Sequence, residues 1–104
     1  MTVLLGNGDG SFQAPKRYAT WGATAVAVGD FNKDGHLDLA VAGVGAPVSI
    51  FLGNGDGTFQ AAQGYLAGTS PVSLAVGDFN GDGLPDLAVA NGYAVTVLLN
   101  AADW

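Results

Sequence analysis

An all-β fold built from a repeated unit is predicted by two features of the sequence. Seventeen of the 104 residues are glycine and none is glutamate, while valine, aspartate and asparagine are frequent. This composition favours short strands joined by tight turns over helices. The second feature is an internal repeat, in which residues 29–42 (GDFNKDGHLDLAVA) match residues 77–90 (GDFNGDGLPDLAVA) at eleven of fourteen positions. Such a repeat indicates that the chain is built from copies of one structural unit.

A second repeated block completes the unit. Residues 5–13 (LGNGDGSFQ) match residues 52–60 (LGNGDGTFQ) at eight of nine positions. An apolar segment precedes each block and occurs a third time near the C-terminus, so that it spans 2–5, 48–52 and 95–99. The Asn-Gly and Asp-Gly steps tolerate positive φ and indicate hairpins. The sequence therefore predicts units of 47–48 residues, each with four strands.

The four strands of a unit differ in composition. The expected ranges are 24–29 and 72–77 for the first strand, 37–42 and 85–90 for the second, 48–52 and 95–99 for the third, and 58–66 and 11–19 for the fourth. The first and second strands are continuously apolar, which is typical of strands that are buried on both faces. The fourth strand is more polar and carries Lys16 and Arg17, so we expect an outer strand that faces water.

A period near 47 with four strands, small buried inner strands and a polar outer strand is typical of a β-propeller blade. A propeller needs about four to eight blades, and this chain supplies two. We expect an outer hairpin over 2–19 that completes a neighbour's blade, a complete blade over 24–66 and the inner three strands of a second blade over 72–99. Copies of the chain would exchange strands head to tail and close into a ring, as a trimer with six blades or a tetramer with eight.

Two aspartate-rich loops follow the first strand of each unit. Residues 30–38 (DFNKDGHLD) and 78–86 (DFNGDGLPD) place oxygen-bearing side chains at loop positions 1, 3, 5 and 9, with glycine at position 6. Calcium prefers six to eight oxygen ligands, whereas magnesium keeps several waters. An EF-hand is excluded because Val41 and Val89 stand at position 12, where that motif needs glutamate. A metal-free turn is the remaining alternative, but it would leave the carboxylates to repel one another.

The combination DFNxDGxxDLAVA followed by VxVLLGNGDGTF resembles the FG-GAP or VCBS repeat of integrin α-subunit propellers, bacterial secreted proteins and fungal lectins. In that family the side chains at loop positions 1, 3, 5 and 9 and the carbonyl at position 7 bind calcium. The resemblance therefore implies two Ca²⁺ sites, made by Asp30, Asn32, Asp34, the His36 carbonyl and Asp38, and by Asp78, Asn80, Asp82, the Leu84 carbonyl and Asp86. It also implies an extracellular setting. The near-identity of the two units and the start within a repeat favour an engineered or excised fragment.

Trp21 is the one candidate ligand-binding residue outside the loops. It lies between the fourth and first strands and has no aromatic counterpart in the second unit. Some lectins of the resembled family bind sugars with a tryptophan, an arginine and a histidine, but neither of the other two accompanies Trp21. A lectin or an adhesive module that binds a protein is thus the alternative to a structural calcium role.

Several functional classes are excluded or disfavoured by composition. The chain has no cysteine, which rules out disulfides and cysteine-based zinc sites. Three basic residues against nine acidic ones leave no basic patch for a nucleic acid. No apolar run reaches the length of a membrane span. No serine–histidine–acid set is repeated, and the GNGDG segments match no phosphate-loop pattern. We therefore expect a protein that is not an enzyme.

Overall fold

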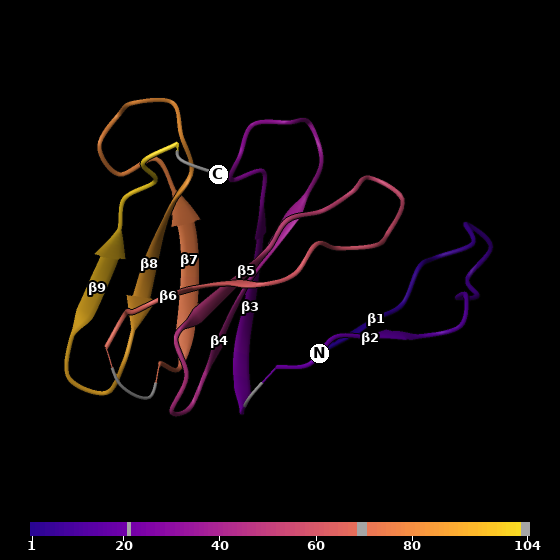
Figure 1. Cartoon of the computed structure of the whole chain (residues 1–104), viewed down its shortest axis with the longest axis horizontal. Helices are drawn as coiled ribbons and strands as arrows, with labels where there is room; N and C mark the ends of the chain where they lie inside the picture. The colour runs from indigo at the N-terminus through magenta and orange to yellow at the C-terminus, as the bar shows by residue number, and fades with distance from the viewer. Residues whose placement is uncertain (21, 69–70, 103–104) are drawn as a thin grey trace.

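The computed structural model describes residues 1–20, 22–68 and 71–102, and every regular element in those ranges is a β-strand (Figure 1). The strands are β1 (Thr2–Val3), β2 (Lys16–Arg17), β3 (Ala23–Gly29), β4 (Asp38–Gly43), β5 (Val48–Phe51), β6 (Gln63–Tyr65), β7 (Ser73–Gly77), β8 (Asp86–Ala90) and β9 (Val95–Leu98). The all-β class is therefore confirmed. No helix of sufficient length and apolarity to cross a membrane occurs in this part of the chain.

The strands form three antiparallel sheets. The first repeat unit gives a four-stranded sheet in the order β3-β4-β5-β6, and the second gives a three-stranded sheet in the order β7-β8-β9. The register repeats between the units, since Val26 faces Val41 in the first sheet and Leu74 faces Val89 in the second. The strands β1 and β2 form a separate two-stranded hairpin. A single chain therefore does not form a closed propeller.

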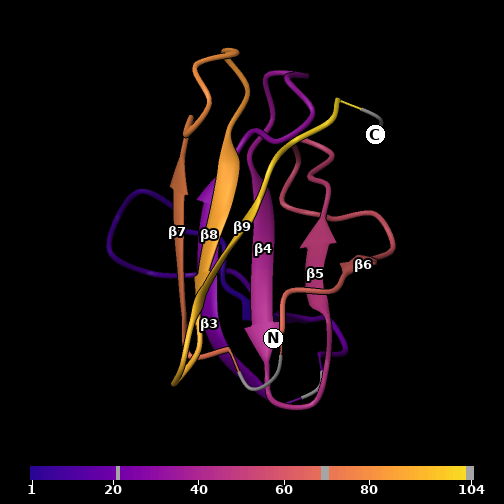
Figure 2. The ribbon, with the colours of Figure 1, turned by 90° about the vertical axis from the view of Figure 1, so that its left-hand side faces the viewer.

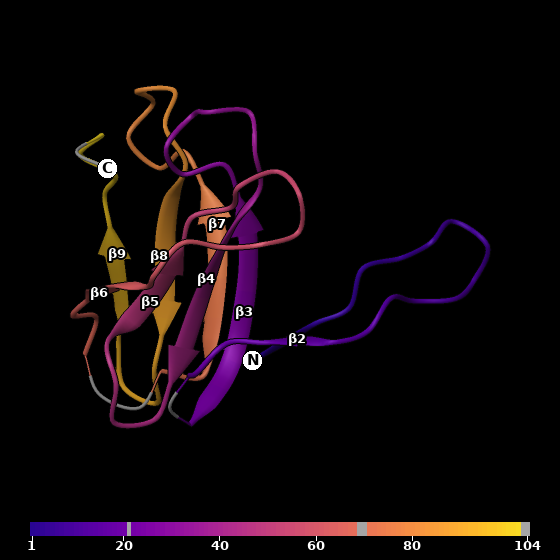
Figure 3. The ribbon, with the colours of Figure 1, turned by 45° about the vertical axis from the view of Figure 1, so that its right-hand side comes forward.

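The two larger sheets lie face to face, with β3 beside β7 (Figures 1 and 2). The β1-β2 hairpin projects from the opposite side of β3, away from the second sheet (Figure 3). The fourth strand of the first unit, β6, lies at the edge of its sheet with Gln63 and Gly64 exposed. It is the polar outer strand that the sequence predicts, although its ladder is limited to Gln63–Tyr65.

One apolar core fills the space between the two sheets. The first sheet contributes small side chains from β4, Ala40 and Ala42, and larger ones from β5, Val48 and Ile50. The second sheet contributes residues of β8, which include Val89. Removing this apolar surface from water is the main favourable term available to a small domain. The core therefore belongs to the contact between repeat units and not to either unit alone.

The prediction that the first strand of each unit is buried on both faces is wrong. Successive side chains of a strand point to opposite faces. In β3, Ala25 and Ala27 pack against the core, while Val26 and Val28 are exposed on the other face. The described part of the chain places no second sheet over that face. The matching prediction holds for β4, which is buried along almost its whole length.

The inter-sheet core leads to a stability prediction at matched valines. Val48 is 0 % exposed, and Val95, at the corresponding position of the second unit, is 66 % exposed. Val48→Ala should lower the free energy of unfolding of the single chain by about 2 kcal/mol, because it leaves a cavity in the core. Val95→Ala should change it by less than about 0.5 kcal/mol. Urea unfolding of dilute protein measures both values, and equal losses would contradict this account of the core.

Candidate metal centre

The two aspartate loops lie at the same end of the stacked sheets, where β3 turns into β4 and β7 turns into β8 (Figures 1 and 2). The ladder explains how the ends of each loop meet. Gly29 faces Asp38 across the β3-β4 pair, and Gly77 faces Asp86 across the β7-β8 pair. Position 9 of each loop is thereby held opposite the residue that precedes position 1. Asp30 and Asp38, or Asp78 and Asp86, are eight residues apart along the chain and can therefore share one small site.

The carboxylate at position 9 is buried in both loops. Asp38 is 0 % exposed and accepts hydrogen bonds from the backbone N–H groups of Phe31 and Gly53, each at 2.8 Å. Asp86 accepts corresponding bonds from Phe79 at 2.9 Å and Asn100 at 2.8 Å. Each aspartate thus connects its loop to the end of the third strand of its unit. A buried charge is tolerated when it is hydrogen-bonded in this way.

The carboxylate at position 1 organises the loop around itself. Asp30 accepts the N–H groups of Asp34 at 3.1 Å and Gly35 at 2.9 Å. Asp78 accepts three N–H groups, from Gly81 at 2.9 Å, Asp82 at 3.1 Å and Gly83 at 2.8 Å. The Gly83 N–H is the largest cause that holds the pKa of Asp78 below its usual value, because a hydrogen bond to the charged form favours it.

The second loop brings its carboxylates close enough to share an ion. One oxygen each from Asp78, Asp82 and Asp86 lies within 4.8 Å of the others. Among the residues that the structure describes, this is the one such group of three acidic, histidine or cysteine side chains. The three predicted aspartates of the first loop do not lie as close to one another as those of the second. The structure therefore brings together the three predicted aspartates of the second loop, whereas those of the first loop are more open.

A different observation indicates a cation at the first loop. The side-chain oxygen Oδ1 of Asn32 is buried and has no hydrogen-bond partner, while the Nδ2 of the same residue donates to Asp34 at 3.2 Å. A buried oxygen without a donor is costly. A cation among the loop oxygens would satisfy it. The residues present in both loops therefore fit the oxygen-rich coordination that calcium prefers.

The loops differ at position 4, where the backbone is left-handed in both. Lys33 has φ of 58°, and Gly81 has φ of 73°. This conformation costs an ordinary L-residue roughly 1–2 kcal/mol, while glycine adopts it freely. The Gly81 N–H can also join the donors around Asp78. The second loop thus adopts this conformation at a lower cost, and Asp78 accepts one more N–H group than Asp30 does.

The remaining predicted residues are placed as follows. The backbone N–H of His36 donates to Asp34 at 2.9 Å, and that of Leu84 donates to Asp82 at 3.0 Å. The His36 N–H is the largest cause that lowers the pKa of Asp34. The imidazole of His36 lies over Gly55 of the neighbouring hairpin, so it supports the loop from outside. Trp21 lies outside the described residues.

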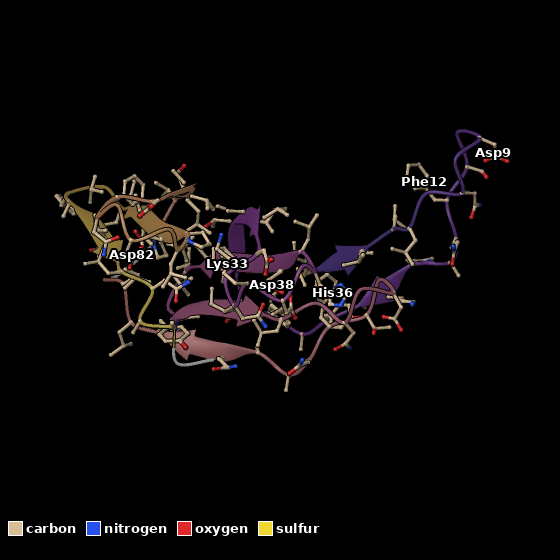
Figure 4. All side chains as sticks on the ribbon, turned by 90° about the horizontal axis from the view of Figure 1, so that it is seen from above. Asp9, Phe12, Lys33, His36, Asp38 and Asp82 are labelled. Atoms are coloured by element: carbon tan, nitrogen blue, oxygen red, sulfur yellow. The ribbon has the colours of Figure 1, made fainter. Side chains whose placement is uncertain are left out.

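Figure 4 shows Lys33, Asp38 and His36 gathered at the first loop and Asp82 at the second, while Asp9 and Phe12 stand at the tip of the projecting hairpin. Asp9 belongs to a GNGDG turn, where its Oδ1 accepts the N–H of Ser11 at 2.9 Å. The equivalent turn has Asp56 bound to Thr58 at 2.9 Å. These aspartates close hairpins, as the turn pattern predicts.

Sequence reasoning missed the residues that cap the buried aspartates. The Gly53 and Asn100 N–H groups follow the third strand of each unit and reach Asp38 and Asp86. The Asn100 side chain also donates from Nδ2 to the carbonyl oxygens of Phe31 at 2.6 Å and Pro85 at 3.1 Å. Their position in the repeat could have identified them, because both residues directly follow a repeated leucine, Leu52 or Leu99.

The two roles of the loop carboxylates can be separated by matched alanine variants. Asp38→Ala should lower the free energy of unfolding by about 2–4 kcal/mol even in EDTA, because it leaves two buried N–H groups without an acceptor. Asp34→Ala should cost less than about 1 kcal/mol in EDTA, because Asp34 is exposed. Urea unfolding in EDTA gives both values. A negligible loss for Asp38→Ala would show that its hydrogen bonds do not hold the loop.

Comparison with known proteins places these loops in a family. The model of the FG-GAP-like repeat matches residues 1–41 and 30–89, so both aspartate loops lie within the matched residues. Neither the curated proteins nor the solved structures contain a significant match. The two overlapping matches cover most of the chain, and they agree with the repeated loops and sheets described above. The chain therefore belongs to the FG-GAP-like repeat family.

Proposed function

We propose that the protein is a non-enzymatic, calcium-stabilised repeat module that assembles with copies of itself into a closed β-propeller. The observation that carries the calcium role is the convergence of the Asp78, Asp82 and Asp86 oxygens within 4.8 Å of one another. Three like charges at that separation repel unless a cation lies among them. The role of the ion in this proposal is structural.

The donor set favours calcium over other metals. Each loop offers carboxylates, an asparagine amide and backbone carbonyls, all of which are oxygen ligands, and the chain has no cysteine. Hard oxygen ligands suit calcium or magnesium, and magnesium retains several waters in a strict octahedron. Calcium accepts more protein oxygens in a flexible arrangement. In this proposal Asp78, Asn80, Asp82, the Leu84 carbonyl and Asp86 hold one ion, and their counterparts in the first loop hold a second.

The calcium role links directly to folding. The loops join the first and second strands of each unit, so an ion held there fixes the corner between those strands. Because an unfolded chain does not preform the site, the binding free energy adds to the free energy of folding. Lectin or adhesive activity remains the alternative expectation, but its candidate residue, Trp21, lies outside the described residues.

Self-assembly is supported by what each sheet lacks. The second sheet stops at β9 and has no fourth strand in the described part of the chain, whereas the first sheet ends in β6. The β1-β2 hairpin pairs with neither larger sheet. An open strand edge presents unpaired backbone groups that another strand can satisfy. A head-to-tail contact closes into a ring when its rotation allows, and two units per chain give six blades from a trimer or eight from a tetramer.

Calcium should raise the melting temperature, and EGTA should reverse the rise. At a free calcium concentration about 100 times the Kd, one site adds about 2.7 kcal/mol to the free energy of unfolding. Asp82→Asn should remove most of the second-loop contribution, since it takes a charge from the converging group. Asp56→Asn is the matched control, because this aspartate is also exposed but lies in a hairpin turn. Calorimetry with and without calcium measures these shifts, and an unchanged wild-type melting temperature would refute the calcium role.

Native mass spectrometry tests the assembly. In calcium the protein should have the mass of three or four chains, and dilution should release single chains. The physical reason is that apolar faces at both ends of the single chain lose water on association. A mass of one chain at every concentration, with the calcium-dependent rise in melting temperature intact, would refute self-assembly and leave the calcium role standing.

A further inference from the structure

We propose that the contact between copies repeats the contact between the two sheets of one chain, and that β9 enters it beside the next copy's β2, in the place that β1 occupies in the single chain. This inference rests on the proposed self-assembly. Beyond self-assembly, it specifies the faces that meet, the strands that pair and the register of that pairing. The counterpart of a residue is the residue at the same place in the other repeat unit.

The outward face of the second sheet is the exposed copy of a buried surface. Four residues that pack in the core, three of them in or directly after β5, are 0–5 % exposed. Their counterparts are about half exposed or more. The pairs are Val48 at 0 % and Val95 at 66 %, Ile50 at 2 % and Val97 at 48 %, Leu52 at 5 % and Leu99 at 56 %, and Phe31 at 2 % and Phe79 at 52 %. Each of these counterparts is thus also apolar, but it remains exposed in the single chain.

The complementary face lies at the other end of the chain. Within the chain, Leu87 and Val89 of β8 and the partly buried Leu74 of β7 receive the buried row of the first sheet. The counterpart of Leu74 is Val26, which is 58 % exposed, and Val28 beside it is 52 % exposed. The counterpart of Val89 is Val41, which is already 4 % exposed in the single chain, so the open part of this face follows β3. Each chain therefore ends in the two different halves of one interface. Such halves make a heterologous contact between copies rather than a symmetric one.

The projecting hairpin already lies at the outer edge of this second face. The ring of Tyr18 contacts Phe51 and Phe59, with ring centroids 6.0 and 5.4 Å apart. The Tyr18 hydroxyl accepts the Phe59 N–H at 3.2 Å. The hairpin therefore stands beside the first sheet as the outer part of a preceding blade, on the side of β3 away from β7 (Figure 3). The inner part, over Val26 and Val28, is left for a neighbour's β7 and β8.

The repeat defines the register of the strand exchange. In the first sheet β5 pairs with β6 as Val48↔Tyr65, Ser49↔Gly64 and Ile50↔Gln63. The counterparts predict that β9 of one copy pairs with β2 of the next as Val95↔Tyr18, Thr96↔Arg17 and Val97↔Lys16. Within one chain β1 makes the same contacts with β2, as Thr2↔Arg17 and Val3↔Lys16. Residues 2–5 and 96–99 share the sequence TVLL, so β1 and β9 compete for one place.

The contacts of the two competitors decide which one is displaced. The strand β1 is paired to β2 at two positions, and backbone hydrogen bonds of Met1 with Tyr18 and of Leu5 with Gln13 extend this contact. None of these bonds reaches a buried side chain. The strand β9 is paired to β8 at four positions, from Leu87↔Leu98 to Ala90↔Val95. The N–H that follows β9, on Asn100, also caps the buried Asp86. Removing β9 would leave a buried carboxylate with a donor missing, so β1 leaves and β9 stays.

Disulfide capture tests the register directly, because the chain has no cysteine of its own. Facing residues of antiparallel strands have Cα atoms about 4.5–5.5 Å apart, within the range that a disulfide spans. The test variant combines Thr96→Cys with Arg17→Cys. The matched variant combines Thr2→Cys with Arg17→Cys, which shares one position and faces it within the chain. Each is assembled in calcium, oxidised mildly and analysed without reduction.

The T96C/R17C variant should give chains linked to one another in the assembled fraction. The T2C/R17C variant should form a bond within the chain in the single-chain fraction and assemble only when reduced. Assembled T96C/R17C protein without links between chains would overturn the proposed register. T2C/R17C protein that assembles fully with its internal bond intact would overturn the displacement of β1.

A second pair of variants tests the same contact without a crosslink. Val97→Asp should weaken self-association by about 100-fold, since it buries an unpaired carboxylate at the interface. Val3→Asp, at the counterpart position in β1, should change it by less than about threefold, because a displaced strand lies outside the contact. The reverse order of effects would overturn the choice of β9. Failure of the wild type to associate would refute the proposed assembly, whereas wild-type association with unaffected variants would refute only this inference.

Discussion

The hydrogen bonds to the buried aspartate at the end of each loop hold the rest of the structure together. Asp38 and Asp86 each accept one N–H from the start of their own loop and one from the end of the third strand. One carboxylate therefore fixes the loop, the second strand and the third strand relative to one another. Its buried charge requires compensation, and the backbone donors supply it. In the second loop, oxygens of Asp78 and Asp82 lie within 4.8 Å of each other and of an Asp86 oxygen.

The repeat places equal residues in unequal surroundings. Val48 and Val95 occupy the same position in neighbouring units, yet one is covered by a sheet and the other faces water. Phe31 and Phe79 differ in the same way. Repeat architectures behave like this because each unit buries its apolar face only against the next unit. The two exposed ends of this chain are therefore a consequence of having two units.

Calcium and assembly act on different parts of the proposed structure. In the proposed assembly the ion would stabilise the corner within a unit, while the apolar faces would act between units. The loops lie at one end of the sheets (Figure 2). The exposed valines of β3 and β9 lie within the strands, at Val26 and Val28 and at Val95 and Val97. A metal-free protein would then lose rigidity at the corners before it loses complementarity of the faces. These contributions can be measured separately, the first by chelation and the second by dilution.

The sequence by itself determined the all-β class, the repeat, the positions of the inner three strands and the family, because local turn chemistry and a near-identical repeat leave little freedom there. The fourth strands were expected over 11–19 and 58–66, but the ladders are limited to Lys16–Arg17 and Gln63–Tyr65. It predicted the loop aspartates, but it did not show that the second loop gathers its oxygens more tightly than the first.

The burial of the first strand of each unit was decided by the tertiary structure. The apolar run of β3 indicated burial on both faces, yet Val26 and Val28 are exposed, because burial depends on which sheet comes next and not on the strand's own residues. The caps on Asp38 and Asp86 likewise come from residues brought near by folding, and no local pattern encodes that contact.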